Sequence, residues 1–134
     1  MDDDSIRAII VEGDDNFRRA FLALLTQRFP FVKFQEEKNG DAVLTKIQGF
    51  LPHILFMELK LPGAKGLELT SRIRHLYPDL VIVIVTGLDL PEYRDAAYER
   101  GANFFISKNT SSAKDLLNTI ELILEGLETS GPSY

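Results

Sequence analysis

Two sequence patterns alternate along this chain, and together they leave few folds open. Short apolar runs, rich in β-branched residues, are each followed by a longer stretch whose apolar residues recur every three or four positions. The runs span residues 6–11, 32–36, 54–57, 80–85 and 103–106. Runs without polar gaps are typical of strands buried on both faces, and the more polar run 32–36 suits a sheet edge.

The stretches between the runs carry apolar stripes at helical spacing. In chain order the stripes are Phe17, Phe21, Leu24 and Leu25; Val43, Leu44, Ile47 and Leu51; Leu69, Ile73 and Leu76; Tyr93, Ala96 and Ala97; and Leu116, Leu117, Ile120, Ile123, Leu124 and Leu127. Pro78 and Gly101 end the third and fourth stretches. Strands that alternate with helices predict the α/β class, with a doubly wound, five-stranded parallel sheet joined by right-handed crossovers.

Composition narrows the functional class. The chain has 134 residues, 45% of them hydrophobic, which suits one globular domain. Fifteen basic residues against twenty acidic ones leave a net charge of −5, unlike a nucleic-acid binder or a basic membrane-surface protein. The longest apolar run, Val81–Val85, is far below the roughly 20 residues of a membrane helix. We expect a cytoplasmic protein without nucleic-acid or membrane partners.

Cysteine content and the two chain ends narrow the class of protein further and give the expected domain boundaries. The absence of cysteine excludes a disulfide scaffold and a thiolate metal site. The acidic N-terminus lacks the basic and apolar regions of a signal peptide. We expect an acidic leader at residues 1–5, one domain at 6–126 and a flexible tail at 127–134.

Polar residues follow four of the predicted strands. They are Glu12, Gly13, Asp14 and Asp15; Glu58; Thr86 and Gly87; and Ser107 and Lys108. Because ligands of such sheets bind beyond the carboxyl ends of the strands, these residues should converge. Carboxylates hold magnesium, while lysine and threonine contact phosphate oxygens. The sequence therefore predicts a site for a phosphoryl group or a divalent cation.

Four segments, in this order and spacing, resemble the receiver domain of bacterial response regulators. They are the acidic cluster after Ile9–Val11 and residues 55–63, 81–87 and 101–108. The resemblance covers residues 6–126 and implies a flavodoxin-like (βα)5 fold with strand order 2-1-3-4-5. It also implies a role in two-component signalling through protein binding, without enzymatic activity of its own.

The resemblance assigns family roles to particular residues. The phospho-acceptor position falls on Glu58, the two metal-holding acidic positions on Glu12 and Gly13, and the switch positions on Thr86, Phe105 and Lys108. Glu58 is one methylene, about 1.5 Å, longer than the family's aspartate, which places the nucleophile where phosphorus and metal belong. Gly13 removes a metal-binding carboxylate. We therefore expect no conventional phosphorylation and at most weak Mg²⁺ binding by Glu12 and Glu58.

Glu58 also suggests a built-in mimic of phosphorylation. Its carboxylate carries a charge of −1 near the place of phosphate oxygens, where a phosphoryl group carries about −1.5 to −2. Lys108 could pair with this carboxylate without any phosphate. We hypothesise that this pair sets the state of the switch residues.

The acidic residues after the first strand allow two interpretations. Asp14 belongs to the acidic pocket with Glu12, or Asp14 and Asp15 cap the following helix. An alignment with a gap would make Asp14 and Asp15 the metal-binding pair; the ungapped one, which we prefer, keeps Arg18 at a position where the family often has arginine.

Two classes of function compete on this topology. The first is a stand-alone receiver that binds a protein, either a histidine kinase or a downstream effector, or forms a homodimer. Its face of fourth helix, fifth strand and fifth helix would present Tyr93, Arg94, Tyr98, Arg100 and Leu122. The second is a flavodoxin-like cofactor binder or a small metal-dependent phosphohydrolase. Glu12–Asp15 would repel a cofactor phosphate, and the hydrolase would need an aspartate nucleophile, so we favour the receiver.

Overall fold

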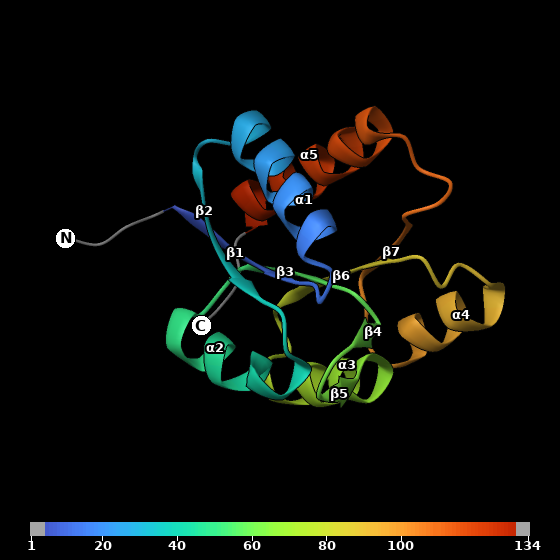
Figure 1. The fold of residues 1–134 in the computed structure, drawn as a ribbon. Coiled ribbons are helices and arrows are strands. Elements are labelled where there is room, and N and C mark those ends of the chain that lie inside the picture. The colour runs from blue at the N-terminus through green and yellow to red at the C-terminus, as the bar shows by residue number, and fades with distance from the viewer. Residues whose placement is uncertain (1–4, 131–134) are drawn as a thin grey trace.

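The computed structural model describes residues 5–130 (Figure 1). Its main sheet contains β1 (Ile6–Val11), β2 (Val32–Glu37), β3 (Ile54–Met57), β6 (Val81–Thr86) and β7 (Phe104–Ser107). The strand order is β2-β1-β3-β6-β7, and every neighbouring pair is parallel. Counted within this sheet, that is the predicted order 2-1-3-4-5, so the predicted α/β doubly wound fold is confirmed.

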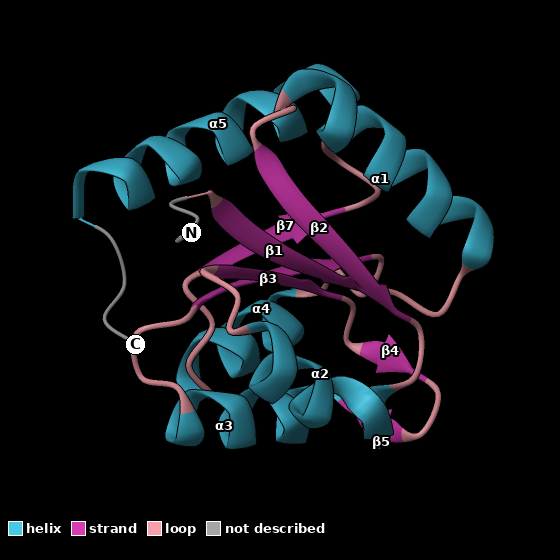
Figure 2. Cartoon of the chain, turned by 90° about the vertical axis from the view of Figure 1, so that its left-hand side faces the viewer, coloured by secondary structure: helices cyan, strands magenta, loops and turns pink. Residues whose placement is uncertain are grey.

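Helices cover both faces of the sheet (Figures 1 and 2). One face carries α1 (Asp15–Arg28) and α5 (Ala113–Ser130). The opposite face carries α2 (Val43–Phe50), which follows the short 3-10 turn η1 (Gly40–Ala42), α3 (Gly66–Leu76) and α4 (Pro91–Glu99). In the part of the chain that the structure describes, none of the helices has the length and apolarity that crossing a membrane requires.

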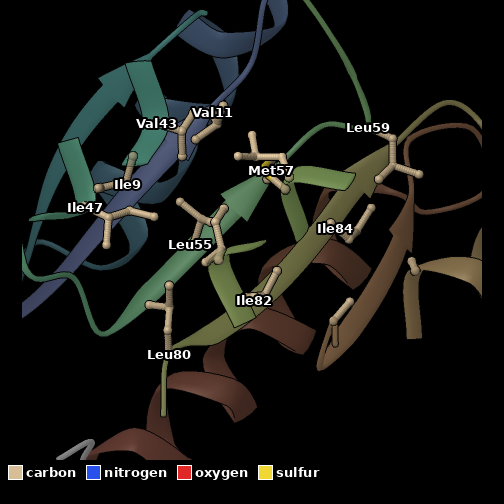
Figure 3. Packing of buried hydrophobic residues seen from close by; sticks show 14 of the residues in the cluster. Ile9, Val11, Val43, Ile47, Leu55, Met57, Leu59, Leu80, Ile82 and Ile84 are labelled. Carbon is tan, nitrogen blue, oxygen red and sulfur yellow. The ribbon is translucent and has the colours of Figure 1, made fainter. Parts of the chain in front are cut away.

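The strands bury side chains on both faces, which explains their uninterrupted apolar sequences. In β1, Ile9 and Val11 join the core under α2, α3 and α4, whereas Ala8 and Ile10 join the core under α1 and α5. Figure 3 shows the first core, where side chains of β1, β3 and β6 gather against Val43 and Ile47 of α2. Burial on both faces fixes the sheet between its two helical layers.

Helix ends differ from the predicted stripes in two places. Leu51 is not part of α2: it has a φ of 51°, lies before Pro52, which disfavours a helical residue at its N-terminal side, and its side chain is exposed. Leu76 is also exposed, because the following residue, Tyr77, packs against the core instead.

The helix α5 continues to Ser130, past residue 127, where the tail was predicted to begin. Leu127 extends the spacing of Ile123 and Leu124 and packs against the same core. The helix therefore has an apolar reason to run on past residue 126. Residues 1–4 of the predicted acidic leader at 1–5, and residues 131–134, lie outside the described residues.

A small hairpin follows β3. Its strands are β4 (Lys60–Leu61) and β5 (Ala64–Lys65), which pair antiparallel. Gly63 has a φ of 81° and follows Pro62, as the two central positions of a type II turn require. The backbone N–H of Gly40 donates to the carbonyl of Pro62 at 2.7 Å, which ties the hairpin to the turn before α2.

Candidate functional site

Three charged side chains meet at the carboxyl edge of the sheet. Glu12 follows β1, Glu58 follows β3 and Lys108 follows β7. Lys108 Nζ donates to Glu12 Oε1 at 2.5 Å and to Glu58 Oε1 at 2.9 Å. The three side chains are 6%, 8% and 17% exposed, in the order Glu12, Glu58, Lys108. We call them the acid–lysine cluster. The predicted pairing of Lys108 with Glu58 is present, and Glu12 is a second partner that the sequence did not indicate.

The other oxygen of each carboxylate is bound to backbone. Glu58 Oε2 accepts from the N–H of Leu59 at 2.6 Å and of Lys60 at 3.1 Å. Glu12 Oε2 accepts from the N–H of Asp14 at 3.0 Å. Buried carboxylates are stable only when they are paired and hydrogen-bonded. The turns after β1 and β3 thus hold both carboxylates in place, and every oxygen of the cluster is engaged.

Lys108 remains charged in this setting. Burial alone would lower its pKa, but the hydrogen bonds to Glu12 and Glu58 outweigh burial and raise the pKa above its ordinary value. The ammonium also lies 4.1 Å from the centroid of the Phe17 ring, which favours a cation over its face. Phe17 is a site residue that sequence reasoning placed only in the core, because its helical spacing gave no other signal.

The cluster does not fit a tightly held magnesium ion as it stands. The ammonium of Lys108 bridges the carboxylates of Glu12 and Glu58, and Mg²⁺ needs near-octahedral oxygen ligands at 2.0–2.1 Å. Among the described residues, no group of three or more acidic, histidine or cysteine side chains is placed to hold a metal.

Position 13, where glycine replaces a metal-binding carboxylate, also leaves little room for a side chain. A Cβ at Gly13 would lie 2.9 Å from Pro62 Cδ of the β4–β5 hairpin, a distance that forces one of them to move. An aspartate could therefore not take this position without a shift of Pro62 or of the loop that holds residue 13. The close approach of Pro62 is therefore compatible with glycine at position 13, which has no side chain.

Asp14 caps α1 and does not contribute its carboxylate to the cluster. Asp14 Oδ1 accepts from the N–H of Asn16 at 2.9 Å and of Phe17 at 3.1 Å, the bonds of an N-cap residue. The prediction that the Asp14 carboxylate lies in the acidic pocket is thus wrong. Only the backbone N–H of Asp14 contacts the pocket, where it donates to Glu12. The capping interpretation is the one that the structure shows.

Arg18 closes the loop beside the cluster. Its guanidinium donates to Asp15 Oδ1 at 2.7 Å, to Glu36 Oε1 at 3.1 Å and to the carbonyl of Glu12 at 2.9 Å. The hydrogen bond from Arg18 is the main cause that lowers the pKa of Asp15. The spacing of Asp15 and Arg18 in the sequence could have indicated this pair; the contact to Glu12 depends on the fold.

The two predicted switch residues Thr86 and Phe105 are both buried. Thr86 Oγ1 accepts from the N–H of Leu88 at 3.1 Å, and the carbonyl of Thr86 accepts from the N–H of Lys108 at 2.9 Å. Phe105 is 7% exposed, and the Arg94 guanidinium lies 5.4 Å from its ring centroid. Thr86 is thus connected to the cluster through the backbone of Lys108, whereas Phe105 lies in the core beneath α4.

A further polar network ties the loop after β6 to the loop after β7. Ser107 Oγ donates to Asp89 Oδ2 at 3.1 Å. Asn109 Nδ2 donates to Asp89 Oδ2 at 3.2 Å and to the carbonyl of Gly87 at 3.0 Å. The sequence did not indicate this role of Asp89, because the network depends on two loops distant in the chain. The loop that leads into α4 is therefore fastened to the segment that carries Lys108.

The fold and the acid–lysine cluster at the carboxyl edge of the sheet define a class of protein. It is a doubly wound domain whose acidic and basic side chains meet at the edge where receiver domains bind phosphoryl groups. The sequence profile of the response regulator receiver domain matches residues 8–121, and the chain belongs to this family. The family membership does not favour the cofactor-binder and phosphohydrolase alternatives.

Known relatives and structures agree with this assignment. The chain is 24% identical over 127 residues to response regulator GacA of Pseudomonas protegens, an alignment that covers 95% of this chain and 59% of GacA. It is 30% identical over 120 residues to oxygen regulatory protein NreC of Staphylococcus aureus, with 87% of this chain and 55% of NreC covered. The chain thus spans between half and three-fifths of the length of these relatives.

Solved structures show the same fold. A CheY-like receiver domain protein from Methanospirillum hungatei superposes with a TM-score of 0.84 at 24% identity, covering 95% of this chain and 99% of that one. A two-component response regulator of the LuxR family from Aurantimonas superposes with a TM-score of 0.82 at 28% identity, covering 91% and 86%.

Proposed function

We propose that this chain is an atypical receiver in which the acid–lysine cluster replaces phosphorylation, and that it signals in the cytoplasm by binding a protein. The observation that carries the proposal is the ion pair of Glu58 Oε1 with Lys108 Nζ at 2.9 Å. The role is one of signalling, not of catalysis.

The contacts of Glu58 argue against conventional phosphorylation. A phosphoryl acceptor needs an oxygen that is held in line with the leaving group. Oε1 is engaged by the ammonium of Lys108, and Oε2 accepts two backbone N–H groups. In the part of the chain that the structure describes, no group of three or more acidic, histidine or cysteine side chains is placed to hold a metal that would neutralise a phosphodonor.

The same contacts support a mimic of the phosphorylated state. The carboxylate of Glu58 supplies the negative charge that Lys108 would otherwise find on a phosphoryl group, although a smaller one. Lys108 is hydrogen-bonded through its backbone to Thr86, and the neighbouring Ser107 and Asn109 hold Asp89. A change at the cluster would therefore reach the loop that leads into α4.

The face of α4, β7 and α5 is our candidate for the protein-binding surface. It includes exposed apolar side chains: Tyr98 is 43% exposed, Phe104 39% and Leu122 70%. We take these exposed apolar side chains as candidates for protein contacts, because apolar surface often marks interaction sites. The partners that the resemblance implies are a histidine kinase, a downstream effector or a second copy of the chain.

Intact mass after incubation with Mg²⁺ and acetyl phosphate tests the proposal. A receiver with an aspartate acceptor serves as the positive control. We expect no phosphoryl adduct on the wild-type chain, and none of substance on Glu58→Asp, because Gly13 still supplies no carboxylate. An adduct on the wild-type chain that is lost in Glu58→Gln would overturn the proposal, and so would strong labelling of Glu58→Asp.

A further inference from the structure

A pocket of about 180 Å³ lies between α1 and α5, over the carboxyl ends of β6 and β7. The two helices lie on the same face of the sheet (Figure 1). The apolar part of its lining consists mainly of Phe17, Phe21, Leu24, Val85, Ile106 and Leu116. The pocket lies on the side of Lys108 that carries Phe17, and neither Glu12 nor Glu58 lines it.

Small side chains keep this pocket open. Ala20 on α1 and Ala113 at the start of α5 line its exposed rim, where larger side chains would narrow the opening. Its deeper walls are fixed, since Phe21, Val85 and Ile106 are 3%, 4% and 8% exposed and belong to the core. A pocket built on core residues exists before any ligand arrives, as is usual for small-molecule sites.

The size and lining of the pocket suit one small ring. An engineered protein cavity of about 150 Å³, lined by leucine, isoleucine and phenylalanine, stays dry and binds benzene. The pocket described here is of similar size, at about 180 Å³. Phe17 and Phe21, whose ring centroids are 5.6 Å apart, offer aromatic surfaces to a ring.

The charges beside the pocket favour a neutral ligand. Lys108 lines one end, but its ammonium is already bound by Glu12 and Glu58. Two carboxylates against one ammonium leave the cluster negative, which opposes an anion. Ser111 also lines the pocket and offers a hydroxyl to a polar group of the ligand.

We propose that this pocket binds a small neutral aromatic compound with one polar group, its ring against Phe17 and Phe21. The proposal stands independently of the function proposed above. Because Phe17 and Lys108 form both a wall of the pocket and a cation–π contact beside the cluster, an occupied pocket would adjoin the signalling site directly.

Titration of phenol into the ¹⁵N-labelled chain tests the proposal. We expect saturable shifts of the backbone amides around Phe17–Leu24 and Ile106–Ala113, with a Kd on the order of 1 mM for a ligand of this size. Benzoate, an anion of similar shape, should bind at least about tenfold more weakly. The absence of saturable shifts at about 10 mM phenol would overturn the proposal, and equal binding of benzoate would overturn its preference for neutral ligands.

A matched pair of variants locates the ligand. Ala20→Leu should fill the pocket and weaken phenol binding at least about tenfold, whereas Ala23→Leu, the same change on the same helix outside this pocket, should leave the Kd unchanged. Ala113→Leu fills the pocket from α5 and decides the matter if Ala20→Leu does not fold. Equal losses in the filling variants and in Ala23→Leu would contradict the site.

Discussion

The two ends of the central strands hold polar clusters that are built in different ways. At the amino end, the Arg7 guanidinium donates to the carbonyls of Phe50 and Leu51 at 2.7–3.0 Å, and His53 Nδ1 accepts from the N–H of Arg7 at 2.9 Å. At the carboxyl end, Lys108 joins the side chains of Glu12 and Glu58, and the second oxygen of each carboxylate accepts from backbone N–H groups. One cluster fastens loops, and the other concentrates charge.

This difference separates stability from function. Hydrogen bonds from side chains to loop carbonyls satisfy backbone groups that the strands leave open, so the amino end serves the fold. Buried ion pairs gain little net stability over apolar residues, because desolvation offsets the attraction. We therefore propose that the charges at the carboxyl end serve signalling more than stability.

Removal of Lys108 is expected to have the largest effect of the changes that test the difference between the two ends. Lys108→Ala leaves Glu12 and Glu58 buried beside each other without their cation, so we expect a loss of about 3 kcal/mol in the free energy of unfolding. Urea denaturation at pH 7 measures it, with the exposed Lys114→Ala as the control, expected within about 0.5 kcal/mol of wild type.

The combined change Glu12→Gln, Glu58→Gln and Lys108→Met sharpens the result. It removes all three charges and should recover most of the lost stability, since apolar replacements of buried ion pairs are often neutral. If Lys108→Ala costs no more than Lys114→Ala, the cluster is not a coupled buried unit. If the triple variant is as unstable as Lys108→Ala, the fold itself depends on the charges.

Arg7→Ala should lower the free energy of unfolding by a smaller amount, about 2 kcal/mol. It removes hydrogen bonds to loop carbonyls but leaves no pair of buried charges without a partner. Arg72→Ala, an exposed arginine on α3, is the control. The amides of Gly87–Asp89 provide a second readout: Lys108→Ala should shift them in ¹⁵N spectra and Arg7→Ala should not. Equal shifts from both variants would show that the two ends are not functionally distinct.

The sequence predicted most of the fold, for a physical reason. Strands buried on both faces need continuous apolar residues, and the predicted run 54–57 has the bounds of β3, while 80–85 is one residue from β6. The β4–β5 hairpin was missed, because its short strands depend on the turn at Pro62 and Gly63 and on contacts with the distant Gly40.

The site was predicted as a location more than as a set of contacts. The topology brings strand ends together, so the meeting of Glu12, Glu58 and Lys108 followed from the order of the strands. That Lys108 binds both acids, with the Phe17 ring close to its ammonium, depends on side-chain conformations that no sequence pattern encodes.

The smallest expected effect is a difference in pH dependence between the two ends. Burial, with a smaller contribution from Arg7, lowers the pKa of His53 below 6.5, so the folded chain binds fewer protons there than the unfolded chain. Its stabilising contribution is therefore present above pH 6.5 and is lost as the pH falls through the folded-state pKa. Lys108 has the opposite sign: its raised pKa gives a contribution that is present below pH 10.5 and lost as the pH rises past the folded-state value.

Urea denaturation of wild type and His53→Asn between pH 5 and pH 7 isolates the amino end. Asparagine can still accept from the N–H of Arg7 but cannot be protonated, so the stability of the variant should fall less on acidification than that of wild type. Parallel pH profiles would mean that His53 is not protonated differently in the two states. A difference in the free energy of unfolding that appears only toward pH 5 would show that protonation of His53 destabilises the amino end in acid. Lys108 remains charged at that pH, so the ion pairs at the carboxyl end keep their cation.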